Sequence, residues 1–405
     1  MSTQQGNSAY EQYRSNRDVI SLFSGAMGLD IGMQKAGLNV VIGQDFDASC
    51  VETMKVNGHK VLGGDIREID PQYLLELTGL HVGEPFLICG GPPCQPFSTA
   101  GKRLGINDPR GSLFMEFIRM IGYIRPRFFV MENVKGIMSA PLKHVPAAER
   151  DENDPEQKLG TVLDVILSEF EKLGYKTVYG ILDAVNYGVP QFRERFVLIG
   201  SRDGEDIFLP IPTHFQMHQD PEHRWKTVGE AIRDLENSGG ECAKLSEERK
   251  KYLHMVPEGG NWKDLPQDLI PAAMGGAYES EGGKVGFYRR LSYMQPSPTI
   301  TTAPAQKATM LCHPKQDRPL SVKEYARIQQ FPDDWVFVGT TAAKYKQIGN
   351  AVPVGLGKAI GMAIIAAANK TAVVETKRFR GTSVHSKIKS AIELGGSNGS
   401  NQYEL

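Results

Sequence analysis

Short apolar runs alternate with helical patterns through the first half of the chain, and this alternation limits the fold more than any other feature. Val19 to Phe23 is apolar and leads into a glycine-containing turn, and a helical pattern then continues to Ala36, where Gly37 ends it. A strand, a glycine-rich turn and a helix form the first unit of a doubly wound sheet. Because the alternation recurs to residue 200, we predict an α/β fold with a mostly parallel sheet. The expected strands are 19–23, 40–43, 61–62, 86–89, 128–131, 176–182 and 195–200, and further helices are expected at 48–56, 73–77, 113–124 and 162–173.

The pattern changes after Gly200. The following stretch is rich in Gly, Pro and Thr and has few helical patterns, which indicates a separate, loop-rich domain. Helical patterns return at 322–329 and 355–368, and 143–158 is a polar insertion expected to form an exposed loop. The predicted organisation is a polar N-terminal tail (1–17), a sheet domain (18–200), a loop-rich domain (201–316), a return to the sheet domain (317–372) and a mobile tail, first basic and then rich in Gly, Ser and Asn (373–405).

The bulk composition excludes several classes of protein. Of the 405 residues, 40% are hydrophobic and 23% charged, which is typical of a globular protein, and no stretch approaches the roughly 20 apolar residues of a membrane span. The N-terminus has no apolar segment of a secretory signal. Five cysteines without a C-x-x-C pair argue against a disulfide framework and against a metal site, so we expect a cytoplasmic protein. The net charge of −1 neither predicts nor excludes a nucleic-acid partner.

Polar or aromatic side chains follow the second and third expected strands. Asp45 could accept hydrogen bonds from both hydroxyls of a ribose, Phe46 could lie on a base, and Asp65 could accept from an adenine amino group. Taken singly, such acids are more often helix caps or solvated turn residues, and a glycine turn often binds nothing. Together they predict an adenosine-containing cofactor at the carboxyl edge of the sheet. Since there is no G-x-G-x-x-G, a dinucleotide is disfavoured.

A proline-rich segment with one thiol follows the fourth expected strand. It reads Gly-Gly-Pro-Pro-Cys-Gln-Pro-Phe-Ser over residues 90–98, and its prolines exclude a helix. A rigid loop that presents Cys94 at the sheet edge suits a nucleophile. The alternative role of a cysteine is that of a small buried apolar residue, and we expect this role for Cys50 and Cys89.

Two further strand ends carry candidate catalytic residues. Glu132 ends the fifth strand, which should neighbour the fourth, so Cys94 and Glu132 should face one crevice. A buried carboxyl keeps its proton more readily and could donate to a ring nitrogen. Arg193 and Arg195 alternate onto one face and could hold a base carbonyl or a carboxylate. The alternatives are a solvated strand-end glutamate and structural ion pairs.

Taken together, these segments resemble the C5-cytosine DNA methyltransferase family over most of residues 18–370. Met27 is a departure, because many members carry a second glycine there, and we expect it to crowd the turn without abolishing cofactor binding. The resemblance is carried by Phe-Ser-Gly-x-x-Gly-Leu at 23–29 (cofactor motif), Gly-Pro-Pro-Cys-Gln-Pro-Phe-Ser at 91–98 (nucleophile loop), Glu-Asn-Val at 132–134, Gln-x-Arg-Glu-Arg at 191–195, Arg-Pro-Leu-Ser-Val-Lys-Glu-Tyr-Ala-Arg at 318–327 with Phe-Pro at 331–332 (the motif that braces the recognition domain), and Tyr-Lys-Gln-Ile-Gly-Asn-Ala-Val-Pro at 345–353.

The resemblance implies a Rossmann-like fold, S-adenosylmethionine as cofactor and double-stranded DNA as substrate. Cys94 would add to C6 of a cytosine flipped out of the helix, Glu132 would protonate N3, and Arg195, with Arg193, would hold the base oxygen. The implied cofactor-binding residues are Phe23, Gly25, Gly28, Leu29, Asp45, Phe46, Asp65, Ile66, Pro92, Asn350 and Ala351, and the implied DNA contacts are Gln95, Ser98, Lys102 and Arg103 on the loop and Arg289, Arg290 and Thr299–Thr302 in the recognition domain (201–316).

The family analogy also suggests a monomer in a restriction–modification system, with a cognate endonuclease that need not touch it. Two other readings of the same motifs remain open. One is a related enzyme that methylates cytosine in tRNA, although nothing in 201–316 points to it. The other is a DNA-binding relative without activity, which the presence of Cys94, Glu132 and Arg195 disfavours.

Overall fold

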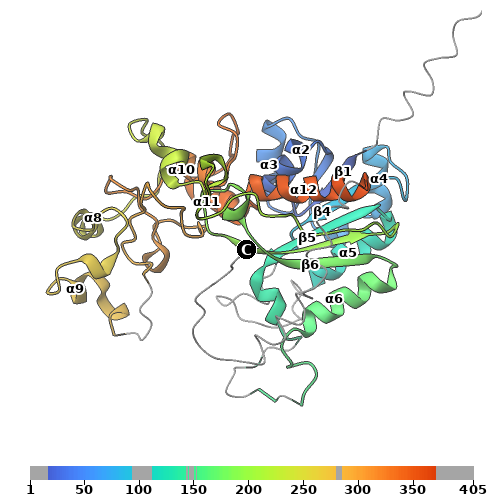
Figure 1. Cartoon of the computed structure of the whole chain (residues 1–405), viewed down its shortest axis with the longest axis horizontal. Coiled ribbons are helices and arrows are strands. Elements are labelled where there is room, and N and C mark those ends of the chain that lie inside the picture. Colours follow the sequence, from blue (N-terminus) through green and yellow to red (C-terminus); the bar gives the residue numbers. More distant parts are fainter. Residues whose placement is uncertain are drawn as a thin grey trace, which may run out of the picture.

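A seven-stranded sheet organises the larger part of the molecule (Figure 1). The structure is a computed structural model that describes residues 17–93, 112–142, 145, 150–151, 153–279 and 285–370. The strand order is β3-β2-β1-β4-β5-β7-β6, so the chain reverses its direction of travel across the sheet between β1 and β4. The strands are β1 (Asp18–Leu22), β2 (Asn39–Asp45), β3 (Val61–Gly63), β4 (Leu87–Gly90), β5 (Phe128–Val134), β6 (Lys176–Asp183) and β7 (Glu194–Ser201).

Helices cover both faces of this sheet, which gives three layers (Figure 1). Alternate residues of each strand point to opposite faces. Ile20 and Phe129 therefore pack in one core cluster with α4, α5 and α6, whereas Val19 and Phe128 pack in another with α2 and α12. The helices are α2 (Gly28–Lys35), α3 (Ala48–Val56), α4 (Pro71–Thr78), α5 (Ser112–Ile124), α6 (Thr161–Lys172) and α12 (Val354–Ala368).

The predicted doubly wound α/β fold is confirmed, and the expected elements lie within a few residues of their places. β4 and β5 pair in parallel, so their carboxyl ends lie side by side at one edge of the sheet. β7 inserts between β5 and β6 and is antiparallel to both. Its direction follows from the short connection after β6, since a parallel neighbour would need a crossover of a dozen or more residues.

The last helices meet the length and hydropathy of a membrane span, contrary to the expectation from the sequence. The stretch Thr341–Ala368 spans 28 residues with a mean hydropathy of 1.8 in its most apolar window, of which 61% is buried within the molecule. Two helices share the stretch, α11 (Thr341–Asn350) and α12. Leu356, Ile360 and Ile364 of α12 belong to the core beneath the sheet, so α12 is a core helix.

The predicted recognition region contains short helices joined by loops, among its described residues 201–279 and 285–316. Three α-helices lie there, α7 (Val228–Ile232), α8 (Glu247–His254) and α9 (Ile270–Met274), and α8 and α9 stand apart from the sheet in Figure 1. Eleven buried residues between Leu245 and Cys312 form a core of their own. Other residues of the region, Val228 and Tyr293 among them, share a cluster with Met27 and Ile348, so this region and the sheet domain are packed together.

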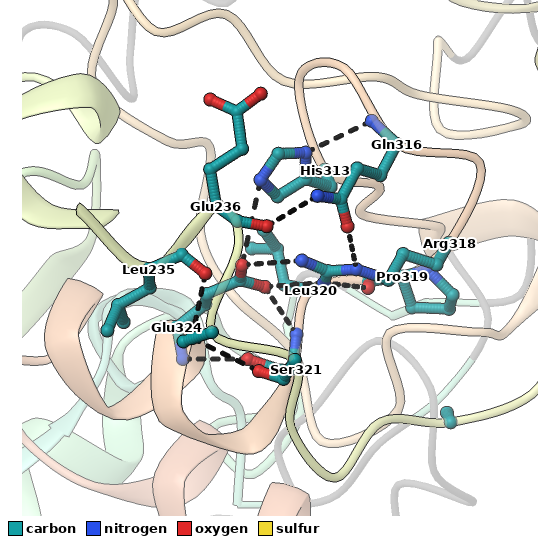
Figure 2. Close-up of polar contacts among 12 residues, drawn as sticks. Leu235, Glu236, His313, Gln316, Arg318, Pro319, Leu320, Ser321 and Glu324 are labelled. Atoms are coloured by element: carbon teal, nitrogen blue, oxygen red, sulfur yellow. Dashed lines mark hydrogen bonds and ion pairs between the residues drawn. The ribbon is translucent and has the colours of Figure 1, made fainter. Parts of the chain in front are cut away.

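A buried polar network fastens this region to α10 (Val322–Ile328) (Figure 2). Glu324 is 1% exposed, and its carboxylate accepts two hydrogen bonds from the Arg318 guanidinium, at 2.7 and 2.8 Å, and one from the Ser321 backbone amide at 2.6 Å. Burial alone would raise the pKa of Glu324, but Arg318 and the Ser321 amide hold it below its usual value. The His313 ring lies 3.6 Å from the same carboxylate. This network provides a physical basis for the bracing role expected of 318–327.

Candidate active site

A cleft of about 650 Å³ opens at the carboxyl ends of the parallel strands. It lies where the strand order reverses between β1 and β4, the place where α/β sheets of this kind bind ligands. The ends of β1, β2, β4 and β5, the start of α2 and the residues around 350 all contribute to its wall. All the predicted cofactor residues line it: Phe23, Gly25, Gly28, Leu29, Asp45, Phe46, Asp65, Ile66, Pro92, Asn350 and Ala351.

The turn after β1 has a backbone that few residue types adopt. Gly25 has φ of +55°, and the two side-chain-bearing residues Phe23 and Met27 also have positive φ, of 54° and 67°. Such strain persists where the surroundings hold it in place, often at functional sites. The Met27 side chain is fully buried in the core cluster with Ala26 and Ile31, and it does not line the cleft. The prediction that Met27 crowds the turn near the cofactor is therefore wrong, because its side chain points into the core.

The turn also fits closely against the last motif. A Cβ atom at Gly28 would lie 2.2 Å from the Val352 carbonyl oxygen, so only glycine allows this approach. Ala351 and Val352 are thereby brought to the cofactor turn from the far end of the sequence. Asn350, the final residue of α11, lines the same wall.

Asp45 and Phe46 at the end of β2 suit an adenosine. Asp45 accepts hydrogen bonds from the backbone amides of Gly25 (2.7 Å) and Asp47 (2.8 Å), so it holds the turn and still has acceptor positions free. Burial raises the pKa of the Asp45 carboxyl, although these amides act in the opposite direction. Phe46 is 76% exposed although it borders a cleft, as expected of an aromatic ring that a flat ligand would cover.

The acid after β3 is less free than the sequence suggested. The Asp65 side chain caps a short helix through the Arg67 amide at 3.0 Å and forms a two-pronged ion pair with the Arg67 guanidinium, which lowers the pKa of Asp65. Arg67 makes four hydrogen-bond contacts to the two Asp65 oxygens, about as many as a carboxylate accepts, so an adenine amino group would compete with Arg67 for this acid. Arg67 lines the cleft too and was not identified from the sequence.

Glu132 and Arg195 form an ion pair beside the predicted nucleophile loop. Glu132 is 9% exposed, and its Oε1 lies 2.8 Å from Nε of Arg195 on the neighbouring strand β7. Oε2 borders the backbone of Gly91, where a Cβ atom would lie 2.9 Å away. Burial raises the pKa of Glu132, and the nearby Arg195 and Arg193 reduce this rise without cancelling it. Glu132 therefore holds a proton more readily than an exposed glutamate does.

Asn133, to which the sequence analysis assigned no role, fixes the start of the Cys94 loop. Its Nδ2 donates to the Pro92 carbonyl at 2.9 Å, and its Oδ1 accepts from the Val134 amide at 2.8 Å. Pro92 and Pro93 line the cleft, so the chain enters the loop at the site. Cys94, and with it Gln95, Ser98, Lys102 and Arg103, lies outside the described residues.

Arg193 is buried and bonded to main-chain carbonyls. It is 1% exposed and donates to the carbonyls of Ile300 (3.0 Å) and Gly349 (2.6 Å), and burial lowers its pKa. Gln191 accepts from the Ile300 amide at 2.9 Å and donates to Gln329, the residue after α10, at 3.0 Å. These bonds tie the recognition region to the cofactor wall, which favours a positioning role for Arg193 over contact with the base.

The residues of 201–316 that were predicted to contact DNA differ in how free their side chains are. Arg290 is 4% exposed, and its guanidinium donates to four carbonyl oxygens and to Asp317, so we withdraw the predicted DNA contact of Arg290. The Thr299 hydroxyl donates to the Phe192 carbonyl at 2.7 Å. Arg289 is half-buried and donates to the Val285 carbonyl at 2.9 Å, with its terminal nitrogens still able to reach a phosphate.

Comparison with known proteins identifies the family. The family model described as "C-5 cytosine-specific DNA methylase" matches residues 17–366. The chain is 37% identical over 355 residues to the type II methyltransferase M.Sau96I of Staphylococcus aureus. That alignment covers 87% of this chain and 77% of that protein. It is 40% identical over 357 residues to the type II methyltransferase M.PspPI of Psychrobacter sp. (strain TA137), and that alignment covers 86% of this chain and 78% of that protein.

Solved structures share the fold. A DNA modification methyltransferase encoded within an Escherichia coli prophage superposes with a TM-score of 0.62 at 20% identity, over 87% of this chain and 99% of that one. The Entamoeba histolytica methyltransferase EhMeth gives 0.54 at 15% identity, over 86% and 97%. Because the family model spans the sheet domain, residues 201–316 and the segment 345–353, the chain belongs to the C-5 cytosine-specific DNA methylase family and is a DNA (cytosine-5-)-methyltransferase that uses S-adenosylmethionine.

Proposed function

We propose that this enzyme methylates a cytosine flipped out of duplex DNA, with Cys94 as the nucleophile, Glu132 as the general acid and Arg195 as the residue that orients Glu132. The observation that carries the proposal is the buried pair of Glu132 and Arg195, 2.8 Å apart, beside the anchored start of the Cys94 loop. The target base must leave the stack, since the ring atoms to be attacked are not accessible within a duplex.

The residues divide the chemistry between them. The Cys94 thiolate adds to C6, which makes C5 nucleophilic, and Glu132 donates a proton to N3 so that negative charge does not build up on the ring. The cofactor supplies a methyl group made electrophilic by its sulfonium. A base, such as solvent water or hydroxide, then takes the C5 proton, Cys94 leaves C6 as the thiolate, and N3 returns its proton to Glu132, which restores the aromatic ring. Arg195 holds one oxygen of Glu132, which leaves the other, beside Gly91, to face the base.

The cleft fits the cofactor that the family uses. Asp45 would accept from the ribose hydroxyls, the exposed ring of Phe46 would lie on the adenine, and Asp65 with Ile66 would border its edge. Gly28 allows Ala351 and Asn350 to close the opposite wall. These side chains bind and orient the cofactor.

Asp45→Ala should weaken binding of S-adenosylmethionine by roughly 10- to 100-fold and change DNA binding much less. The lost hydrogen bonds to a charged acceptor are worth about 1.5–3 kcal/mol, and the turn also loses its bonds from Gly25 and Asp47. Isothermal calorimetry measures the change. Asp18→Ala, at the start of β1, is the control, because the Asp18 side chain accepts a hydrogen bond from Asn39 and does not line the described cleft. An unchanged cofactor affinity in the Asp45 variant would contradict the assignment.

A transfer assay with labelled cofactor tests the substrate. Label should enter duplex DNA and not tRNA. Label in tRNA would instead favour the related tRNA-modifying activity, and label in neither, with intact cofactor binding, would favour a relative without activity. Bisulfite sequencing of DNA from a methylation-free host that expresses the chain would then identify the methylated cytosine.

We further propose that the enzyme acts as a cytoplasmic monomer in a type II restriction–modification system, beside an endonuclease that reads the same site. The support is the similarity to M.Sau96I and M.PspPI, which carry the name type II methyltransferase. Protection is the test, since DNA from an expressing host should resist an endonuclease specific for the methylated sequence.

Sequence specificity should reside in the recognition region. The cleft accommodates one base and one cofactor, whereas neighbouring base pairs remain stacked and display their edges in the major groove. Replacing 201–316 with the equivalent segment of a relative of different specificity should therefore redirect methylation, since each wrong base pair costs about 1–3 kcal/mol. Bisulfite sequencing is the measurement.

A second chimera controls for damage to the sheet domain. Exchanging only residues 245–289 replaces most of the separate core and leaves Ile300, which binds Gln191 and Arg193, in place. If either chimera folds, is active and still methylates the original site, the region it exchanges does not determine specificity.

A further inference from the structure

Five acidic residues line the cleft in the described chain, and four of them have a partner. Asp45 accepts from two backbone amides, Asp47 pairs with Lys346 at 2.8 Å, Asp65 pairs with Arg67, and Glu132 pairs with Arg195. The fifth, Asp30, differs from all of these. Both of its carboxylate oxygens are buried, and in the described residues neither has an ion-pair partner or a donor in normal hydrogen-bond geometry.

Asp30 occupies an unusual place for an acid. It is the third residue of α2, it is 0% exposed, and its neighbours in the chain, Leu29 and Ile31, are buried as well. Burial raises the pKa of Asp30 to about 6, and the charge of Asp45 adds to this rise. The Ser21 hydroxyl and the Asp30 backbone amide lie near the carboxylate but outside normal hydrogen-bond geometry, and they only partly oppose the rise. A buried carboxylate without a partner is costly, so a binding site that keeps one usually has a cation or donor to match it.

The cofactor offers such a group. Asp45, Phe46 and Asp65 are assigned to the adenosine, which leaves the amino-acid end of the cofactor without an assigned partner. That end carries an α-ammonium, which has three donors and a positive charge. Among the acids of the described cleft, Asp30 alone is both unpaired and buried, so it can take such a group without first breaking an ion pair.

We propose that Asp30 binds the α-ammonium group of S-adenosylmethionine and so determines that the ligand carries an amino group at this position. The proposal rests on the family's cofactor and concerns binding alone, so it does not depend on the catalytic roles of Cys94 and Glu132. It accounts for the buried oxygens, because ammonium donors would satisfy them.

Binding of two ligands to the full-length enzyme without DNA tests the assignment. The ligands are S-adenosylhomocysteine and an analogue in which hydrogen replaces its α-amino group, and calorimetry gives both affinities. The wild type should bind the analogue about 10- to 100-fold more weakly, the effect expected of a charge-assisted hydrogen bond. Asp30→Asn should lose a similar factor for S-adenosylhomocysteine and almost nothing for the analogue.

Asp47→Asn is the matched control, because Asp47 lines the same cleft but pairs with Lys346. It should keep the wild-type preference for the amino group. Equal weakening of both ligands by Asp30→Asn, or no weakening of either, would overturn the proposal. If Asp30→Asn does not fold, Asp30→Ser takes its place, and a wild type that binds both ligands equally would overturn the proposal without any variant. Failure of the wild type to bind S-adenosylhomocysteine at all would count against the cofactor assignment itself.

Discussion

Replacing Cys94 with serine should abolish methyl transfer while the affinities for S-adenosylmethionine and duplex DNA stay close to those of the wild type. A hydroxyl is far less ionised and less nucleophilic than a thiol, so addition to C6 would not proceed at a useful rate. Transfer of labelled methyl groups to DNA is the measurement, with calorimetry to verify cofactor binding. The segment that leads into Cys94 is already held at the cleft by Asn133, and serine does not alter that bond.

A trapping experiment tests the role of Cys94 without measuring a reaction rate. DNA that carries 5-fluorocytosine at the target should form an adduct with the wild type that survives denaturation, because fluorine cannot leave as the C5 proton does. Cys94→Ser should form none. Cys242→Ser is the control, because Cys242 is a half-exposed thiol outside the cleft and should leave both transfer and trapping unchanged. Substantial turnover by Cys94→Ser would exclude the thiol as the nucleophile.

Local chemistry explains why much of the fold could be predicted. The helix expected at 48–56 has those bounds in the structure, because Asp47 caps its first turn and the chain leaves the helix at Asn57 before Gly58. The place of β7 between β5 and β6 could not be predicted in the same way. The apolar alternation of a strand does not show which strands it pairs with across the sheet.

The candidate site also contains residues that could be predicted from the sequence and residues that could not. Asp45 and Glu132 were identified because strand ends in this fold meet at one edge, which is a rule of topology. Arg290 and Arg195 look alike in sequence, yet one is used up by carbonyl oxygens and the other holds Glu132. Only tertiary packing distinguishes them. Asp30 was missed because an acid in the first turn of a helix usually stabilises the helix from its surface. The available signal was its place between Leu29 and Ile31 in a helix buried along its first six residues.

Glu132→Gln should slow methyl transfer by about 10²–10⁴-fold, the usual contribution of a general acid. The amide can still donate a hydrogen bond to N3, so base flipping and DNA affinity should survive, but it cannot give up a proton as charge develops. Single-turnover transfer on saturating DNA measures the chemical step. Glu194→Gln is the control, since Glu194 neighbours Arg195 in the chain but pairs with the exposed Lys135.

The pH dependence separates an acid from a structural glutamate. Because burial raises the pKa of Glu132 and a bound base would bury it further, the protonated, active form should persist toward neutral pH. The single-turnover rate of the wild type should fall as the pH rises through that pKa. The rate of Glu132→Gln has no such group to lose and should lack this descending limb. A wild-type rate in the glutamine variant, or an identical pH profile in both, would leave Glu132 with a purely structural role through its ion pair with Arg195.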